Sequence, residues 1–367
     1  MSRRLLAATA ISALGVATVL IPSGPASAAP PSGVSLGVVK NLDVTNKGLL
    51  VFADGGGPKV QVKSWDPSHP GNPPVVLVDG LPAGSASAAT NDHKDIWVIY
   101  GGDDSGAESA SAWYIPYKGK AKRVLDVAKF QQTSSLDPYD IDDPPNPGES
   151  NPYDVEVLPD GSALIADAAG NDLIRVDKTG KARTVACFPD QLETTKYVPK
   201  EVLGGMTLPP QIPAEAVPTG VTLDGHGNAY VSLLTGFPFA LGTAKVIRVS
   251  VDAKKAGCSG DPTHPVWPGP VAASGFTGIN DVWMGLDGAL YVTELTRNGI
   301  WGAEAALESG DLTALTGTGR VTRVKLGSRT EVGKGLLTFP GSAVLARDGH
   351  VYATNTFLFG ATLIKIS

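Results

Sequence analysis

The sequence is poor in the side chains from which nucleophilic and transition-metal sites are usually built. Its 367 residues include only two cysteines and five histidines. The histidines are scattered, and no two stand at the spacing of a metal-binding pair. They are His69, His93, His226, His264 and His350. None falls in register with the acidic positions described below, so the sequence provides no histidine general base.

Charged residues are also scarce, and the net charge is negative, which disfavours binding to a polyanionic partner. Charged residues make up 18% of the chain and hydrophobic residues 42%, a composition that excludes a disordered protein. The net charge is −6. Because an acidic chain has no electrostatic basis for binding nucleic acid or an anionic lipid surface, we expect neither partner.

Long apolar runs are missing except at the N-terminus. Arg3 and Arg4 precede the apolar run of residues 5–21, and Ala26-Ser27-Ala28 follows as a small-x-small cleavage signal. This pattern is typical of a secretory signal peptide that is cleaved after Ala28. We expect residues 1–28 to be the leader and 29–367 to form one secreted, extracellular domain. No other run is long enough to span a bilayer, so no membrane insertion is expected.

Glycine and proline are abundant, with 44 and 29 residues, which indicates many turns and short strands. One unit recurs: strand, Asp-Gly or His-Gly hairpin turn, strand, loop, and a third strand with a basic residue near its end. Its best-preserved copy is "LPDGSALIADAAGNDLIRV", from Leu158 to Val176. The four clearest units begin at Asn151, Val217, Gly278 and Phe339.

Two weaker copies precede these four, one from Lys40 to Trp65 and one opening with "NDHKDIWVIYGG". Six tandem units of four antiparallel strands predict an all-β, six-bladed β-propeller, because radial closure removes long exposed sheet edges. The last unit stops after its third strand, and residues 34–41 look like an orphan fourth strand. We therefore expect this N-terminal strand to pair beside residues 363–366 and close the ring.

Some motifs are more specific than a generic propeller unit. They are "SNPYDVEVLPDGSALIADAAGNDLIRV", "LTGFPFALG" and the acidic stretch "SSLDPYDIDDPPNPGESNPYD". Together they resemble the ScyD/ScyE family of secreted bacterial propeller proteins, over Val127 to about Leu295. The resemblance implies a six-bladed fold and export, and it implies no known chemistry. The chain departs from the family at Leu233, where relatives usually carry an acid, and in a first unit without the Pro-Arg-Gly opening.

Aligning the six units on their turns gives two rings of positions. The inner strands start at Asn41, Ala88, Asp154, Gly220, Asp281 and Ser342. The second strands end at Asp54, Gly101, Asp167, Leu233, Glu294 and Asn355. Because a hairpin brings the chain back on itself, both rings are predicted at the same end of the barrel, near the central channel.

The oxygen-bearing members of these rings have two interpretations. One is a hard-cation site, with Ca²⁺ as the expected ion; its ligands would be Asp54, Asp154, Asp167, Asp281, Glu294 and Asn355. The other is structural, because Asp and Asn at strand ends cap turns with their side chains. The acidic linker of residues 137–154 lacks the order of a tight calcium loop, and we interpret it as solvated.

Three further features are ambiguous in the sequence. Cys187 and Cys258 form either a disulfide, which we favour for an exported chain, or two buried thiols. Phe237 and Phe239 lie on a loop at the end of the acidic ring and form either a ligand platform or a contact packed over the blade. We interpret the remaining aromatics of interest as packing residues between blades: Trp267, Trp283 and Trp301.

Two functions are consistent with these observations. The favoured one is a secreted, monomeric binding or scaffold propeller without chemistry, which recognises a small ligand, a glycan or a protein at the channel mouth. The alternative is a divalent-metal-dependent, lactonase-like hydrolase. It would use Asp154, Asp167, Asp281, Glu294 and Asn355. The leucine at position 233 and the lack of a general base count against it, and the fold alone does not decide because propellers host both roles.

Overall fold

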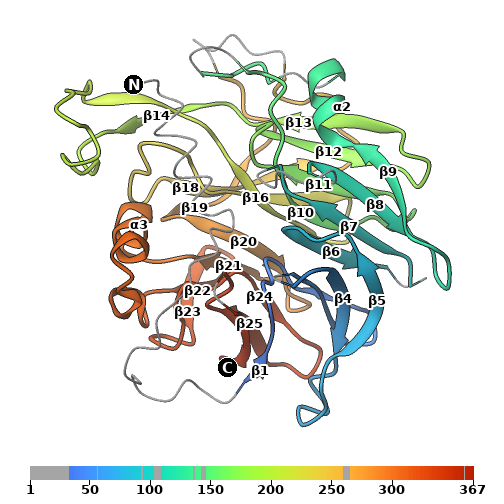
Figure 1. Ribbon diagram of the computed structural model, residues 1–367. Helices are drawn as coiled ribbons and strands as arrows, with labels where there is room; N and C mark the ends of the chain where they lie inside the picture. The colour runs from blue at the N-terminus through green and yellow to red at the C-terminus, as the bar shows by residue number, and fades with distance from the viewer. Residues whose placement is uncertain are drawn as a thin grey trace.

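The computed structural model describes residues 33–367 apart from 56, 92–93, 103–108, 135–136, 142–145, 259–264 and 359. The expected signal peptide lies outside these residues. The described chain forms six four-stranded antiparallel sheets arranged around a common centre, as Figure 1 shows. The predicted six-bladed propeller is therefore confirmed. No helix in the described part of the chain is long and apolar enough to cross a membrane.

Each blade runs from an inner strand at the channel to an outer strand at the rim. In chain order, the first five blades are β2 (Asp43–Val44), β3 (Leu50–Asp54), β4 (Val60–Trp65) and β5 (Val75–Leu81); β6 (Ala86–Thr90), β7 (Ile96–Tyr100), β8 (Ser111–Ile115) and β9 (Lys122–Asp126); β10 (Pro152–Val157), β11 (Ala163–Asp167), β12 (Asp172–Val176) and β13 (Ala182–Cys187); β16 (Pro218–Leu223), β17 (Asn228–Leu233), β18 (Ala244–Ser250) and β19 (Val271–Phe276); and β20 (Ile279–Met284), β21 (Leu290–Glu294), β22 (Arg320–Lys325) and β23 (Ser328–Val332).

The sixth blade contains strands from both ends of the described chain. β24 (Ala343–Leu345), β25 (Val351–Asn355) and β26 (Thr362–Lys365) are completed by β1 (Val34–Ser35), which Figure 1 shows beside the chain's end. Val34 pairs with Leu363 and Ser35 with Thr362, so the predicted closure is confirmed. The closing strand is shorter than expected because the chain crosses to the first blade, where Val38 forms a bridge with Gly55.

The core lies between the blades. The second strands of five blades, such as β7 with the sequence IWVIY, are buried along their whole length. A strand that is covered on both faces needs a continuous apolar run rather than alternation. The outer strand β5 shows the opposite extreme, with five of its seven residues exposed.

Two insertions in the repeat carry secondary structure of their own. Residues 190–216 contain the hairpin β14 (Gln191–Thr194) and β15 (Gln211–Ala214). Between β21 and β22 lie the helix α3 (Ile300–Ser309) and the 3-10 helix η1 (Leu312–Leu315). A further helix, α2 (Val127–Ser134), follows β9.

The two cysteines are joined, which confirms the favoured disulfide. The Cα atoms of Cys187 and Cys258 lie 4.9 Å apart and the S–S distance is 2.12 Å. The bond ties the end of β13 to the segment after β18. The backbone N–H of Cys187 also donates to the carbonyl of Ala256, at 2.9 Å.

Replacing both Cys187 and Cys258 by alanine should lower the free energy of unfolding by about 2–5 kcal/mol. The reason is that the cross-link spans 71 residues of chain and so restricts the unfolded state. Guanidinium unfolding followed by tryptophan fluorescence measures the effect. Dithiothreitol should bring the wild type down to the stability of the variant and leave the variant unchanged. Equal stability of the two oxidised proteins would contradict a native cross-link.

Candidate functional site

The first ring predicted from the sequence forms a hydrogen-bonded belt around the channel. The Asn41 Nδ2 donates to Asp154 Oδ1 at 2.9 Å, and Asn41 also exchanges hydrogen bonds with the backbone of Ala88. The second oxygen of Asp154, Oδ2, accepts from the backbone N–H of Val221 at 2.8 Å. Asp154 therefore ties the third blade to the first and the fourth.

The belt continues through the remaining blades. Asp281 accepts a hydrogen bond from Ser342, whose Oγ accepts in turn from the backbone N–H of Leu42 at 3.1 Å. A Cβ atom added to Gly220 would lie 2.7 Å from Asp281 Oδ1 and 2.7 Å from Ser232 Oγ. The fourth blade thus carries glycine at its ring position because these two side chains fill the space.

The second ring holds the loops that lead into the inner strands. In four blades its side chain accepts a hydrogen bond from a backbone N–H just before the inner strand of the same blade. The pairs are Asp54 with Gly37 (2.8 Å), Asp167 with Asn151 (2.6 Å), Glu294 with Thr277 (2.7 Å) and Asn355 with Thr338 (2.5 Å). All four side chains are buried.

These four side chains have further contacts inside the protein. Asp54 Oδ2 accepts from Lys63 at 2.6 Å, and Glu294 accepts two hydrogen bonds from Arg320 at 2.5 Å each. Asp167 Oδ2 accepts from Ser150 at 2.6 Å and from Gln131 at 3.0 Å.

The six predicted calcium ligands therefore fall into two groups with different hydrogen-bond partners. Asp154 and Asp281 belong to the belt, and the other four are engaged within their own blades. In the described residues, no group of three or more His, Cys, Asp and Glu side chains is arranged to hold a metal ion.

A hydrophobic cluster rich in aromatic side chains contains the predicted phenylalanines. Phe237 and Phe239 pack against Trp301 of α3, with ring centroids 6.0 and 5.4 Å away. The indole N–H of Trp301 donates to the carbonyl of Pro238 at 3.0 Å. Phe239 is buried and Phe237 half-buried. Both phenylalanines thus occupy positions packed against the fold, within a hydrophobic cluster that also contains Phe339 and its stacking partner Phe357.

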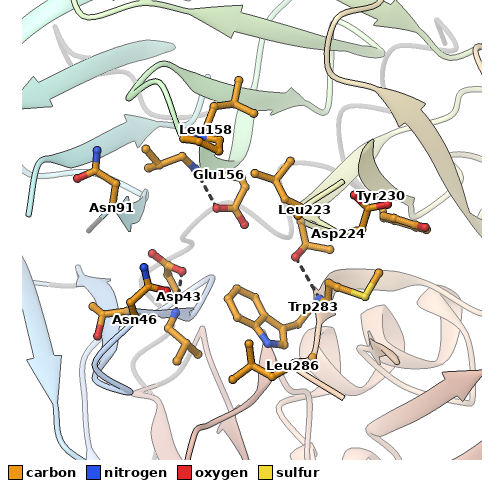
Figure 2. Close-up of a pocket in the computed structure, with 18 of the residues that line it drawn as sticks. Asp43, Asn46, Asn91, Glu156, Leu158, Leu223, Asp224, Tyr230, Trp283 and Leu286 are labelled. Carbon is orange, nitrogen blue, oxygen red and sulfur yellow. Dashed lines mark hydrogen bonds between the residues drawn. The ribbon is translucent and has the colours of Figure 1, made fainter. Parts of the chain in front are cut away.

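The end of the channel at which the inner strands finish opens into a cavity of about 820 Å³. Hairpin turns between inner and second strands surround it, as Figure 2 shows. Five blades contribute to its rim, through Asn46, Asn91, Pro159, Asp224 and Leu286. This open mouth lies at the end away from the two rings.

Two carboxylates stand at the floor of this cavity. Asp43 on β2 and Glu156 on β10 lie two residues beyond Asn41 and Asp154 along the inner strands. Because side chains in a strand alternate with a period of two, they face the channel as the ring residues do. Figure 2 shows both carboxylates pointing into the cavity from different blades. Sequence reasoning missed this pair, although the same period of two could have found it.

Burial and mutual repulsion perturb these carboxyl groups. Burial raises the pKa of Asp43 to about 6, although hydrogen bonds from the backbone N–H groups of Thr90 and Val44 act to lower it. Burial and then the negative charge of Asp43 raise the pKa of Glu156 well above its ordinary value. Deeper in the channel, burial raises the pKa of Asp281 to about 7, and burial with the charge of Asp281 raises that of Asp154.

The walls of the cavity combine polar and apolar side chains, and the apolar and aromatic ones include Trp283, Tyr230, Leu223 and Met284. The indole N–H of Trp283 is buried and has no hydrogen-bond partner in the described part of the chain. The sequence interpretation gave Trp283 a packing role. It does contact two hydrophobic clusters, and it also lines the cavity. No lysine or arginine stands among the described residues that line the site.

No family model and no curated protein matches the sequence. Solved structures do resemble the chain. The PQQ-bound aldose sugar dehydrogenase of Streptomyces coelicolor is 10% identical, covers 94% of this chain and 99% of its own, and has a TM-score of 0.51. A gluconolactonase from Xanthomonas campestris is 11% identical, covers 95% and 99%, and also has a TM-score of 0.51. At such identities the similarity shows the propeller fold alone.

Glu294→Gln should lower the free energy of unfolding by about 3 kcal/mol, because the guanidinium of Arg320 loses its carboxylate partner at a buried site. Glu294 is 0% exposed and pairs with Arg320. Asp252→Asn is the matched control: Asp252 also pairs with an arginine but is 85% exposed. Exposed ion pairs contribute little, so this variant should unfold like the wild type in urea. Equal losses in the two variants would contradict a structural role for Glu294.

Proposed function

We propose that this chain is an exported binding propeller of the ScyD/ScyE type whose turn-side channel mouth binds a small organic cation. The observation that supports this most is the placement of Asp43 and Glu156 at the floor of a cavity whose walls include apolar and aromatic side chains. The volume of about 820 Å³ falls within the range of small-molecule sites. A single protonated or quaternary amine would complement the negative charge of this floor.

Each part of the cavity has a role toward such a ligand. The two carboxylates accept charge-assisted hydrogen bonds from an ammonium group or balance a quaternary one. Trp283 and Tyr230 provide aromatic surface, which favours cations. Leu223 and Met284 contact the apolar part of the ligand.

The hydrolase alternative has less support from the geometry. Three of its five residues, Asp167, Glu294 and Asn355, hold backbone N–H groups of their own blades. The remaining two, Asp154 and Asp281, are belt residues with partners in neighbouring blades. Among the described residues, the histidine that lines the cavity is His226, which is exposed in a turn at its rim.

The affinity for an organic cation should rise with pH. A positive ligand stabilises the ionised form of Asp43, whose pKa of about 6 lies above its ordinary value. At pH 5 a proton must leave before the cation binds, whereas at pH 7.5 Asp43 is mostly ionised. Binding should therefore weaken as the pH falls through about 6.

Isothermal titration calorimetry at pH 5 and 7.5 tests the proposal with benzylammonium, benzyltrimethylammonium and neutral benzyl alcohol. We expect the wild type to bind at least one cation and to discriminate against the alcohol. Asp43→Asn should weaken cation binding roughly tenfold or more and remove the part of its pH dependence that the titration of Asp43 contributes. Asp252→Asn, an exposed acid elsewhere, should leave binding unchanged. Failure of both cations to bind at millimolar concentration, or equal binding of the alcohol, would refute the proposal.

A further inference from the structure

A second cavity, of about 980 Å³, lies between the first and second blades. Its apolar floor comes from both blades and includes Val51, Val78, Ile96 and Ile115. These residues belong to, or pack against, the hydrophobic cluster between the two blades. The groove therefore reaches down to the core, which a shallow surface depression does not do.

Four lysines surround this groove. They lie in three different turns of the first two blades and are Lys47, Lys94, Lys118 and Lys120. All four are exposed, and none forms an ion pair with a carboxylate in the described part of the chain. The Nζ atoms of Lys94 and Lys118 lie 4.8 and 5.3 Å from the ring centroid of Tyr117, which gathers two positive charges at one edge of the groove.

The single carboxylate among the described lining residues is already engaged. Asp79 accepts from Gln61 Nε2 at 3.0 Å and from the backbone N–H of Gly80 at 2.7 Å. The described lining therefore has four lysines and one carboxylate, a positive balance in a protein whose net charge is −6. A cluster of like charges beside an apolar floor favours an occupant that is negative at one end and apolar along its length.

The apolar surface continues beyond the groove along the outer strand β5. Val75, Val76 and Leu77 are 62%, 45% and 45% exposed, and Leu77 also lines the groove. Exposed apolar side chains beside a groove are available to contact a bound molecule.

We propose that this groove is a binding site for a small anionic amphiphile, namely an aliphatic or aromatic monocarboxylate. The carboxylate lies among the lysines, where charge-assisted hydrogen bonds hold it. The apolar body covers the floor formed by Val51, Ile96 and Ile115. The volume is at the upper end of the range for small-molecule sites, which favours a small occupant over a folded partner. The inference does not rest on the proposed cation site, because Asp43 and Glu156 do not line the groove.

Calorimetric titration with octanoate tests this site, with 1-octanol and octylammonium as matched probes. We expect octanoate to bind most tightly and its affinity to fall as sodium chloride rises from 50 to 500 mM, because salt screens the lysines. Lys94→Gln/Lys118→Gln should weaken octanoate binding roughly tenfold and leave octanol binding unchanged. Leu77→Ser should weaken the binding of both probes, because Leu77 lines the apolar part.

The control is Lys200→Gln/Lys365→Gln, which removes two exposed lysines outside the groove and should keep wild-type affinity. All substituted lysines are at the surface, and circular dichroism with thermal melting verifies that the variants fold. Absence of octanoate binding, equal affinity for octanol, or wild-type affinity in Lys94→Gln/Lys118→Gln would overturn the proposal. Asp43→Asn should bind octanoate normally, so failure at this groove is distinct from failure at the channel mouth.

Discussion

The six inner strands are held together by side chains rather than by a β-ladder, and the rest of the molecule depends on this belt. Each blade is a separate sheet, so polar groups facing the channel must find partners across blade boundaries. At least one hydrogen bond crosses every boundary. In chain order the residue pairs are Asn41–Ala88, Ser87–Tyr153, Asp154–Val221, Thr219–Ile279, Asn280–Gly341 and Ser342–Leu42. The carboxylate and amide groups nearest the centre of the ring are therefore hydrogen-bonded between blades.

Carboxylates that are hydrogen-bonded between blades are less available to a ligand than those that face the cavity. Both oxygens of Asp154 have partners in other blades, whereas Glu156, one alternation further along the strand, faces the open cavity with Asp43. At the other end, residues of α3 pack in a hydrophobic cluster with Tyr153 and Phe339. Burial is the largest cause of the raised pKa values of Asp43, Glu156, Asp154 and Asp281.

The sequence predicted the parts that repetition specifies. Register along the repeats placed Asn41, Asp154 and Asp281 in one ring, and the missing fourth strand predicted the closure. The repeat pattern could not predict at which end of the channel α3 packs. This helix lies in an insertion, and its packing depends on residues far away in the chain. Nor could the pattern explain Gly220, where an added Cβ would meet Ser232 of the same blade and Asp281 of the next blade at 2.7 Å each. The groove lysines come from three separate turns, which only the tertiary structure brings together.

Departures from the repeat coincide with the second cavity, and this has a physical explanation. In well-preserved blades the turn acid binds the basic residue of the third strand, as in Asp160 with Arg175 (2.5 Å) and Asp287 with Arg323 (2.6 Å). Each such pair balances opposite charges within one blade. The first blade instead has Asn46-Lys47-Gly48 at its turn, and Lys47 has no described acidic partner. A turn that carries a lysine in place of the acid leaves a positive charge available to a ligand, and a functional site is where such a departure from the repeat is expected.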